Sequence, residues 1–574
     1  MANSVIEAES ILAIDIGSVN TRVLLFDEAE GTYHFVASAV APSTVDAPFN
    51  DLNEGVHRAL LALQQNTDRV LLNIESELIL PSKNDGSGVD RMVVTFSAGP
   101  ALQIVTLGLL PEVSLESANR MASTTYGQVV EFIGLADDRR PEVQLDAVLR
   151  AEPDLVILAG GTNDGADHSV LKMVDLIALA CKVLPKGKQP VVFYAGNPAL
   201  AQKVKESLER LTSVYVAPNI RPHIDREDIF SGAESLANTV SQMRLQKLNG
   251  LEGLGGKSPI PPQPGSSAFG SLIRFFSRVY DPTKGVLGID MGASWTTVAT
   301  AFDGRLSLST LPVGMGRGLK NFMRQVPLAD ILQWLPIDIP ADVVRDYLWQ
   351  KSLYPASIPM TDETLAIEQS AARQMLYTSI IALIQQGLNN GWYFEPIFVA
   401  GSTLTHAPTS AQTLLMLLDG IQPLGITSLL LDPHGLTTSL GAIAQFNSLL
   451  PVQVVESSAY FNLATVISPI SSEKFGTPIL NMRLELGEGN ENSYTVKQGS
   501  LVMLPLQPGQ KAKVYFEPLR RLTLDPRNWK KGFDIYGGIC GAVIDARGRP
   551  LQLPRDDVHR RELHTRWAEA LKLA

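Results

Sequence analysis

Two short stretches of the 574-residue chain combine an acid, a glycine and hydroxyl side chains at the same spacing. Residues 12–23 read "LAIDIGSVNTRV" and residues 287–298 read "LGIDMGASWTTV". Each stretch is typical of a β-hairpin whose turn is built around glycine. The repeat predicts an internal duplication, and its matched pairs are Asp15 with Asp290, Gly17 with Gly292, and Thr21 with Thr296.

These residue types suit the binding of a polyphosphate. A glycine turn exposes backbone N–H groups and lets a phosphate approach closely. An aspartate at the end of a strand can reach Mg²⁺ through water, because Mg²⁺ keeps several waters and takes few carboxylates. Two facing hairpins would clamp the phosphates, and the candidate ligand-binding residues in them are Asp15, Gly17, Ser18, Thr21, Asp290, Gly292, Ser294 and Thr296. The structural alternative is that Asp15 caps the N–H groups of its own turn.

The remaining sequence predicts the elements around these hairpins. Residues 92–111 carry no charge for 20 residues, but polar residues, glycines and a proline interrupt them, so we expect two buried strands rather than a membrane helix. Residues 141–220 alternate helical and strand patterns, which predicts a parallel sheet. Its "GGTNDG" loop (160–165) is either a binding loop or a tight turn capped by Asn163 or Asp164. Short strand patterns after Val455 predict an all-β region that ends in a helix.

Composition excludes several classes of function. The formal net charge of -11, without a dense basic block, argues against nonspecific nucleic-acid binding. Cys181 and Cys540 lack partners at metal-ligand spacing, which predicts buried free thiols in a reducing compartment. The N-terminus does not read as a signal peptide. We therefore expect a cytoplasmic protein without a transmembrane segment, and none of the eight histidines forms a metal or catalytic motif.

Three arginines cluster near one acid towards the C-terminus, and they are Arg547, Arg549 and Arg555 beside Asp545. We expect a surface turn held by ion pairs. The alternative is a contact with a phosphate or a partner.

The motifs resemble those of a known superfamily. "AIDIGSVNTRV", "GIDMGASWTTV" and "VAGSTL" are similar to the first phosphate, second phosphate and adenosine motifs of the actin-like ATPases. The blocks "SAGPALQIVTLGLLPEVSLESANRMA", "PDLVILAGGTNDG" and "VVFYAGNP" resemble the MutL family of glutamate mutase accessory proteins, over residues 10–445. The adenosine motif adds Gly401 and Ser402 to the candidate nucleotide-binding residues.

The resemblance implies an α/β, two-lobed actin-like ATPase fold. Its lobes would be duplicated ribonuclease-H-like sheets, with an inserted parallel α/β unit and a β-rich C-terminal domain. The predicted boundaries are 1–245 for the first lobe with an insert at about 141–225, 246–272 for a Gly/Pro-rich linker or loop, 273–452 for the second lobe, and 453–574 for the β-rich domain.

The resemblance also implies the function. MutL-like proteins are thought to serve adenosylcobalamin-dependent mutases, by analogy with ATP-driven reactivating factors, which are chaperones that exchange damaged cofactor. We therefore expect ATP and Mg²⁺ as cofactors, mutase subunits as partners, and a possible homodimer. The cobalamin-binding Asp-x-His-x-x-Gly pattern is absent, so the chain is not expected to be a mutase itself.

The second phosphate motif departs from the family. Trp295 stands where a small hydroxyl residue is expected, and Thr297 stands where an acid is expected. Val19 and Ser402 are milder departures in the other motifs. A missing acid removes metal or water positioning, on which phosphoryl transfer depends. We expect nucleotide binding with slow or absent hydrolysis, at most a weak ATPase. The alternatives are a catalytically degenerate scaffold of the cell-division or pilus-assembly type, and a small-molecule kinase.

Overall fold

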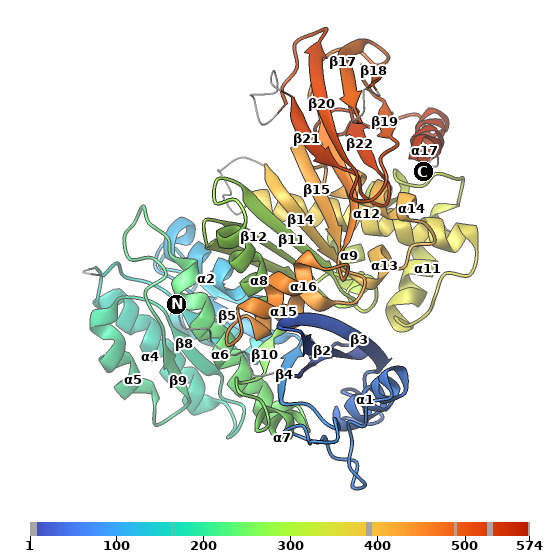
Figure 1. The fold of residues 1–574 in the computed structure, drawn as a ribbon. Helices are drawn as coiled ribbons and strands as arrows, with labels where there is room; N and C mark the ends of the chain where they lie inside the picture. Colours follow the sequence, from blue (N-terminus) through green and yellow to red (C-terminus); the bar gives the residue numbers. More distant parts are fainter. Residues whose placement is uncertain (1–8, 164, 386–392, 487–490, 525–531, 572–574) are drawn as a thin grey trace, which may run out of the picture. The chain divides into compact units, whose positions relative to one another are not determined.

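The computed structural model describes residues 9–163, 165–385, 393–486, 491–524 and 532–571 (Figure 1). The chain divides into two compact units. Unit 1 contains Met1–Leu272, Arg305–Pro312 and Thr438–Ser448, and unit 2 contains Ile273–Gly304, Val313–Thr437 and Leu449–Ala574. The chain crosses between the units at 272/273, 304/305, 312/313, 437/438 and 448/449. The first crossing lies within α8 (Gly265–Val279) and the fourth within α15 (Leu436–Ile443).

The first sheet of unit 1 has five strands in the order β10-β4-β1-β2-β3. Its antiparallel part joins β1 to β2 and β2 to β3, while β4 runs parallel to β1 and β10 parallel to β4. The apolar run of β1 is buried along nearly its whole length, as a central strand requires. The elements are β1 (Ile11–Ile16), β2 (Asn20–Ala29), β3 (Thr32–Pro42), α1 (Asn53–Thr67), β4 (Arg91–Phe96), α7 (Leu251–Gly255) and β10 (Gln263–Pro264).

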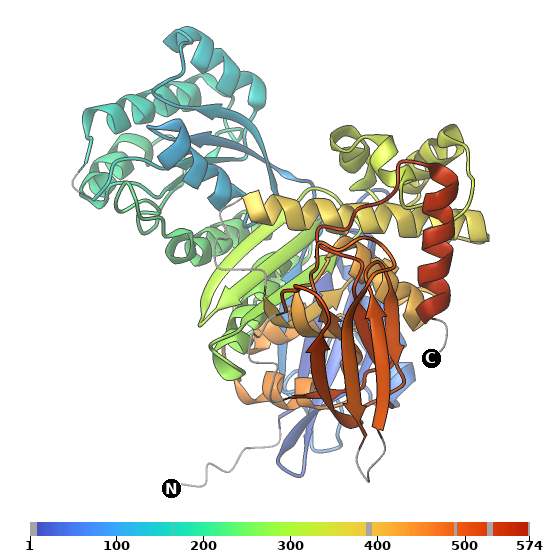
Figure 2. The same ribbon diagram turned by 90° about the horizontal axis from the view of Figure 1, so that it is seen from above.

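A second sheet of unit 1 is entirely parallel, in the order β6-β5-β7-β8-β9. Its strands are β5 (Leu102–Leu107), β6 (Gly127–Ile133), β7 (Leu155–Leu158), β8 (Val191–Tyr194) and β9 (Val214–Val216). Helices cover both faces (Figure 2). One face packs on α3 (Pro141–Ala151), α4 (His168–Val183) and α5 (Ala201–Leu208), and the other on α2 (Glu116–Ala122) and α6 (Ile229–Lys247).

The main sheet of unit 2 repeats the plan of the first sheet. Within unit 2 its strands run in the order β12-β11-β14-β15-β16-β22-β19. The pair β11 and β12 is antiparallel, and β14 and β15 continue in parallel, as β4 and β10 do in unit 1. The strands are β11 (Gly285–Met291), β12 (Thr296–Phe302), β14 (Phe394–Ala400), β15 (Gly425–Leu431), β16 (Phe461–Ser468), β19 (Leu501–Leu504) and β22 (Ala542–Asp545); β13 (Arg305–Leu311) belongs to unit 1.

The C-terminal region adds a four-stranded antiparallel sheet in the order β18-β17-β20-β21. A common core of apolar side chains packs this sheet against β16, β19 and β22. Its strands are β17 (Pro478–Glu485), β18 (Glu491–Lys497), β20 (Lys511–Pro518) and β21 (Phe533–Tyr536). The helices of unit 2 include α9 (Leu319–Gln325), α10 (Leu328–Leu332), α11 (Ala341–Leu353), α12 (Asp362–Gln385), α13 (Ser402–Thr405), α14 (Ser410–Gly420), α16 (Leu449–Glu456) and the terminal α17 (Asp557–Leu571).

The predicted α/β class is confirmed, with duplicated ribonuclease-H-like sheets, an inserted parallel unit and a β-rich C-terminal region. Two details differ. The apolar stretch 92–111 does form two buried strands, but β4 joins the first sheet and β5 the parallel one, so the inserted unit starts earlier than expected. Residues 246–272, expected as a linker, hold the end of α6, α7, β10 and the start of α8. Within the described ranges, no helix combines the length and apolar character needed to cross a membrane.

Candidate functional site

The first hairpin holds Asp15 at the carboxyl end of β1. Its turn is closed by the Gly17 N–H, which donates to the Asn20 carbonyl at 2.9 Å. A Cβ at Gly17 would lie 2.7 Å from that carbonyl oxygen, so this tight turn requires glycine. Asp15 is partly exposed, and the Thr95 hydroxyl on the parallel strand β4 donates to its Oδ1 at 2.8 Å. The carboxylate is therefore held at the end of its strand by a hydroxyl of the parallel neighbour.

The turn of the second hairpin is closed by the same hydrogen bond as the first. The Gly292 N–H donates to the Trp295 carbonyl, again at 2.9 Å. Asp290 pairs across the hairpin with Thr297, as Asp15 pairs with Arg22. Asp290 is partly exposed, but its parallel neighbour is Ala400, which has no hydroxyl to offer. The duplication predicted from the sequence is thus present in the register of both strands.

A glycine-rich segment that the sequence analysis missed supports the second turn. The Met315 N–H donates to the Gly292 carbonyl at 2.9 Å, and the Gly318 N–H donates to the Ala293 carbonyl at 3.0 Å. A Cβ at Gly314 or Gly318 would approach the backbone of this turn to 2.8 Å or less. The alternating glycines of "GMGRG" (314–318) were the available signal.

The adenosine-like motif joins the same end of the unit 2 sheet. Gly401 follows β14 with a φ of 116°, and a Cβ there would lie 2.3 Å from the Met291 carbonyl oxygen. This contact brings Gly401 against the end of β11, one residue beyond Asp290. Ser402 is exposed at the start of the short α13. Unit 2 therefore gathers Asp290, Gly292, Ser294, Gly401 and Ser402 at one edge.

Several hairpin side chains point into the interior instead. Thr21 and Thr296 are fully buried, and the Thr296 hydroxyl donates to the Val313 carbonyl at 2.9 Å. Trp295 is 8% exposed, so its ring is part of the core rather than a surface on which a base could stack. Thr297 is also buried. The polar residues that remain at least partly exposed at the two turns are Asp15, Ser18, Asn20, Asp290 and Ser294.

Each hairpin by itself carries donor types that suit a magnesium–phosphate ligand. Carboxylate and hydroxyl oxygens are hard ligands, and a glycine turn lets a phosphate approach the backbone closely. A Cβ would lie 2.7 Å from the turn's carbonyl oxygen at Gly17 and 3.1 Å from it at Gly292, so the first turn is the tighter of the two. Among the described residues, no group of three His, Cys, Asp or Glu side chains could hold a metal ion by itself. Mg²⁺ would therefore need a phosphate and water for most of its ligands.

The "GGTNDG" loop of the parallel sheet is held by two asparagines. The Asn219 amide donates to the Gly161 carbonyl at 3.0 Å and to Asn163 Oδ1 at 3.0 Å. The Asn197 N–H donates to the Gly160 carbonyl at 3.0 Å. Asp164 lies outside the described residues, and the helix that follows has Asp167 at its N-cap without a side-chain capping bond. Asn163 thus fixes the loop by accepting a hydrogen bond from Asn219, in the segment that follows β9, rather than by capping α4.

A family model described as "MutL protein" matches residues 11–459, which include both hairpins and the parallel sheet. The chain belongs to the MutL family. This membership and the duplicated sheets confirm the predicted actin-like ATPase class of fold.

Individual relatives of this MutL-family chain are distant. Protein MutL of Clostridium tetanomorphum is 22% identical over 309 residues, which cover 52% of this chain and 59% of the relative's own length. The nucleotide-free structure of acetone carboxylase is 11% identical, with a TM-score of 0.35 over 86% of this chain and 82% of that one. A nucleotide-free diol dehydratase-reactivating factor is 11% identical, with a TM-score of 0.30 over 76% of this chain and 99% of that one.

Beyond the MutL match lies the arginine cluster, and the structure corrects its predicted setting. Arg547 and Arg549 are buried, not on a surface turn, and carboxylates occupy their guanidiniums. The distances are 2.6 Å from Arg547 Nη1 to Asp419 Oδ1, 2.9 Å from Arg547 Nη2 to Asp545 Oδ2, 2.7 Å from Arg549 Nη2 to Asp545 Oδ2 and 2.8 Å from Arg373 Nε to Asp419 Oδ2. Burial alone would raise the pKa of Asp545, but Arg547 and Arg549 outweigh it and hold that pKa well below its ordinary value. Neither arginine is available to a phosphate, whereas Arg555 is exposed.

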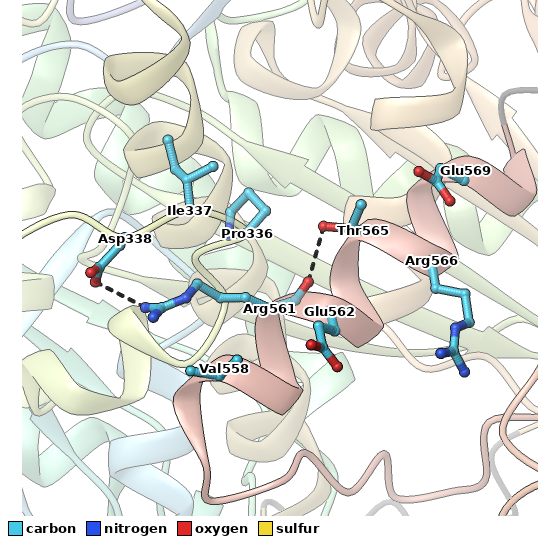
Figure 3. Close-up of a pocket in the computed structure, with 9 residues that line it drawn as sticks. All are labelled: Pro336, Ile337, Asp338, Val558, Arg561, Glu562, Thr565, Arg566 and Glu569. Atoms are coloured by element: carbon cyan, nitrogen blue, oxygen red, sulfur yellow. Dashed lines mark hydrogen bonds and ion pairs between the residues drawn. The ribbon is translucent and has the colours of Figure 1, made fainter.

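A shallow pocket of about 490 Å³ in this MutL-family chain lies between α17 and the segment before α11 (Figure 3). Arg561 crosses it to reach Asp338 at 2.9 Å. None of its lining residues comes from either hairpin; they are Pro336, Ile337, Asp338, Val558, Arg561, Glu562, Thr565, Arg566 and Glu569. Its acids and bases largely neutralise each other, so it is not a phosphate site.

Proposed function

We propose that this chain is a nucleotide-binding accessory protein of the MutL type, serving an adenosylcobalamin-dependent mutase. The observation that carries the proposal is the repeated glycine turn, closed by the same 2.9 Å bond and preceded each time by a partly exposed aspartate. Residues of both hairpins would bind the phosphates of ATP, and Asp15 and Asp290 would hold Mg²⁺ through water. Gly401 and Ser402 would border the adenosine.

Hydrolysis is proposed to be slow or absent. Phosphoryl transfer depends on positioning and on charge aimed at the reacting phosphate. In the second hairpin the acid expected two residues after Trp295 is Thr297, and that side chain is buried. The hairpin therefore offers one carboxylate, Asp290, where the superfamily motif has two. ATP would then act mainly by favouring one conformation of the protein.

Titration calorimetry with Mg²⁺–ATP tests the site. Asp15→Asn and Asp290→Asn remove one negative charge each, and the new amide oxygen at position 15 can still accept from Thr95. Because an interaction with a charged group contributes about 1.5–3 kcal/mol, we expect each variant to bind about tenfold to hundredfold more weakly. Asp68→Asn, at an exposed helix end, is the control and should bind like the native chain. Native protein that binds no Mg²⁺–ATP would refute the proposal.

Two further assays on the same samples separate the functional alternatives. A phosphate-release assay measures turnover, which we expect to be slow. Incubation with an inactivated adenosylcobalamin-dependent mutase holoenzyme, Mg²⁺–ATP and fresh adenosylcobalamin should restore mutase activity by exchange of the damaged cofactor, and the Asp15→Asn variant should not restore it. Nucleotide binding without any effect on a mutase would favour the second candidate, a degenerate actin-like scaffold. The threonine in place of the acid at position 297 is the observation that favours this candidate.

A further inference from the structure

The α11 region of unit 2 exposes large apolar side chains that a folded protein ordinarily covers. Trp349 and Leu353 lie four residues apart on one face of α11, and the chain continues into an apolar loop. Leu353 is 74% exposed, Tyr354 65%, Ile358 75% and Met360 85%. We call these four side chains together with Trp349 the α11 apolar surface. Contiguous exposure of this kind marks an interaction site rather than scattered surface residues.

Buried polar contacts hold the loop that carries these side chains. The Lys351 ammonium is buried, donates to the Ser357 carbonyl and pairs with Glu368 of α12 at 3.0 Å. The Tyr347 hydroxyl donates to the same carboxylate at 2.8 Å. A buried lysine is costly unless it is paired and hydrogen-bonded, so its use here fixes the loop backbone. The backbone that carries the apolar side chains is therefore ordered before a partner binds, and this lowers the entropic cost of binding.

The rim of this surface is acidic. On α11 the positions 342, 346, 349 and 353 form one stripe, so Asp342 and Asp346 border Trp349 and Leu353. Arg345 pairs with Asp346 at 3.4 Å, and the buried Lys351 adds no exposed charge. The exposed charged residues between positions 338 and 363 are Asp338, Asp342, Arg345, Asp346, Asp362 and Glu363.

We infer that the α11 apolar surface docks a protein partner through an apolar segment bordered by lysine or arginine. Charge complementarity selects this occupant. A second copy of the chain in a two-fold dimer would place acidic rim against acidic rim, and an anionic membrane would also be repelled. The inference rests on the proposed function for the identity of that partner, a mutase subunit.

The surface also adjoins the second hairpin. A Cβ at Gly316 would lie 2.8 Å from Pro355 Cβ and 3.0 Å from Ala293 Cβ, so Gly316 packs between the apolar loop and the hairpin turn. A shift of that turn on binding phosphate would press on the docking loop. If the proposed nucleotide binds at that turn, its binding would be coupled to partner binding through this contact.

Two synthetic amphipathic peptides test the surface without any mutase. They share one apolar helical face, which is bordered by lysine in one and by glutamate in the other, and their binding to the full chain is followed by fluorescence anisotropy. We expect the lysine peptide to bind at least about tenfold more tightly, and added salt to reduce the difference. Ile358→Ser/Met360→Ser should weaken its binding at least about tenfold. Both side chains are exposed, so the double variant should fold like the native chain.

A control variant and the contrary outcomes complete the test of the docking surface. Ile74→Ser, at a fully exposed isoleucine of unit 1, should bind the peptide like the native chain. Equal binding of the two peptides, or unchanged binding by the double variant, would overturn the inference. So would a dimer in sedimentation, or binding to phosphatidylglycerol vesicles, that the double variant abolishes. A mutase holoenzyme that binds neither native nor variant chain would instead count against the proposed function.

Discussion

The two aspartates of the hairpins occupy equivalent backbone positions but different surroundings. Asp15 accepts a hydrogen bond from Thr95, whereas Asp290 has Ala400 at the matching place. The Thr95 hydroxyl uses one lone pair of Asp15, and the neighbouring strand supplies no such hydroxyl at the matching place beside Asp290. The hairpin threonines, by contrast, are buried and serve the fold.

At the same scale, His564 of α17 predicts a pH dependence of stability. Burial lowers its pKa to about 4, and its Nε2 lies 3.0 Å from the Gln333 carbonyl oxygen, which requires the neutral ring to donate there. Between pH 6.5 and 4 the unfolded chain binds a proton that the folded chain does not. Stability is thus full above about pH 6.5 and falls as the pH drops towards 4, by on the order of 3 kcal/mol.

Urea unfolding at pH 7 and at pH 5 measures this loss. His564→Gln keeps a donor near Gln333 and cannot titrate, so its stability should change less between the two pH values. His559→Gln, at an exposed histidine of the same helix, should retain the native dependence. If the free energy of unfolding changed equally between pH 7 and pH 5 in the native chain and in the His564→Gln variant, the assignment to His564 would be wrong.

At the scale of elements, one arginine joins three parts of unit 2. Arg547 follows β22, contacts Asp419 of α14, and its guanidinium carbon lies 4.8 Å from the centre of the Trp567 ring on α17. Asp419 in turn holds Arg373 of α12. The C-terminal segment is thereby fixed to the helices that cover the main sheet.

Arg547→Met tests this connection. It leaves buried carboxylates facing too little positive charge, so we expect the free energy of unfolding to fall by about 3–5 kcal/mol. Chemical unfolding at pH 7 measures the change. Arg58→Met removes an exposed ion pair to Glu54 on α1 and should cost at most about 1 kcal/mol. Equal effects of the two substitutions would show that the buried network contributes no special stability.

At the scale of the whole chain, the main sheet of unit 2 continues past the end of the MutL match at residue 459. β16 pairs antiparallel with β15, and β22 and β19 follow. The β-rich tail is therefore attached through main-chain hydrogen bonds and a shared core, rather than through a linker.

A chain that ends at residue 459 should consequently fold poorly. Truncation exposes β15 as a new edge strand and leaves Asp419 without Arg547. We expect low soluble yield and no cooperative thermal transition by circular dichroism, whereas a chain ending at Leu571, which keeps every described element, should behave like the full one. A cooperative transition in the shorter chain would mean that the tail is a separate module.

The sequence by itself determined the local features and the family. The hairpins, their acids and glycine turns, the parallel α/β stretch and the β-rich tail could be predicted because alternation, helical period and turn chemistry are encoded by neighbouring residues. The motifs that carry the family resemblance are equally local. The glycines at 314, 316 and 318 were visible as a pattern, but nothing near them in the sequence shows that they pack on a hairpin turn.

Only the tertiary structure decided what covers each element. A pattern gives the apolar face of a strand or helix but not its neighbour, so β4 and β5 were placed together although they join different sheets. Asp419 and Arg547 are far apart in the sequence, and their pairing converts an expected surface turn into a buried network. Trp349, Leu353 and Met360 read as ordinary core residues. They remain exposed although the opposite face of α11 packs on its neighbours, because burial depends on the contacts that the whole fold leaves available.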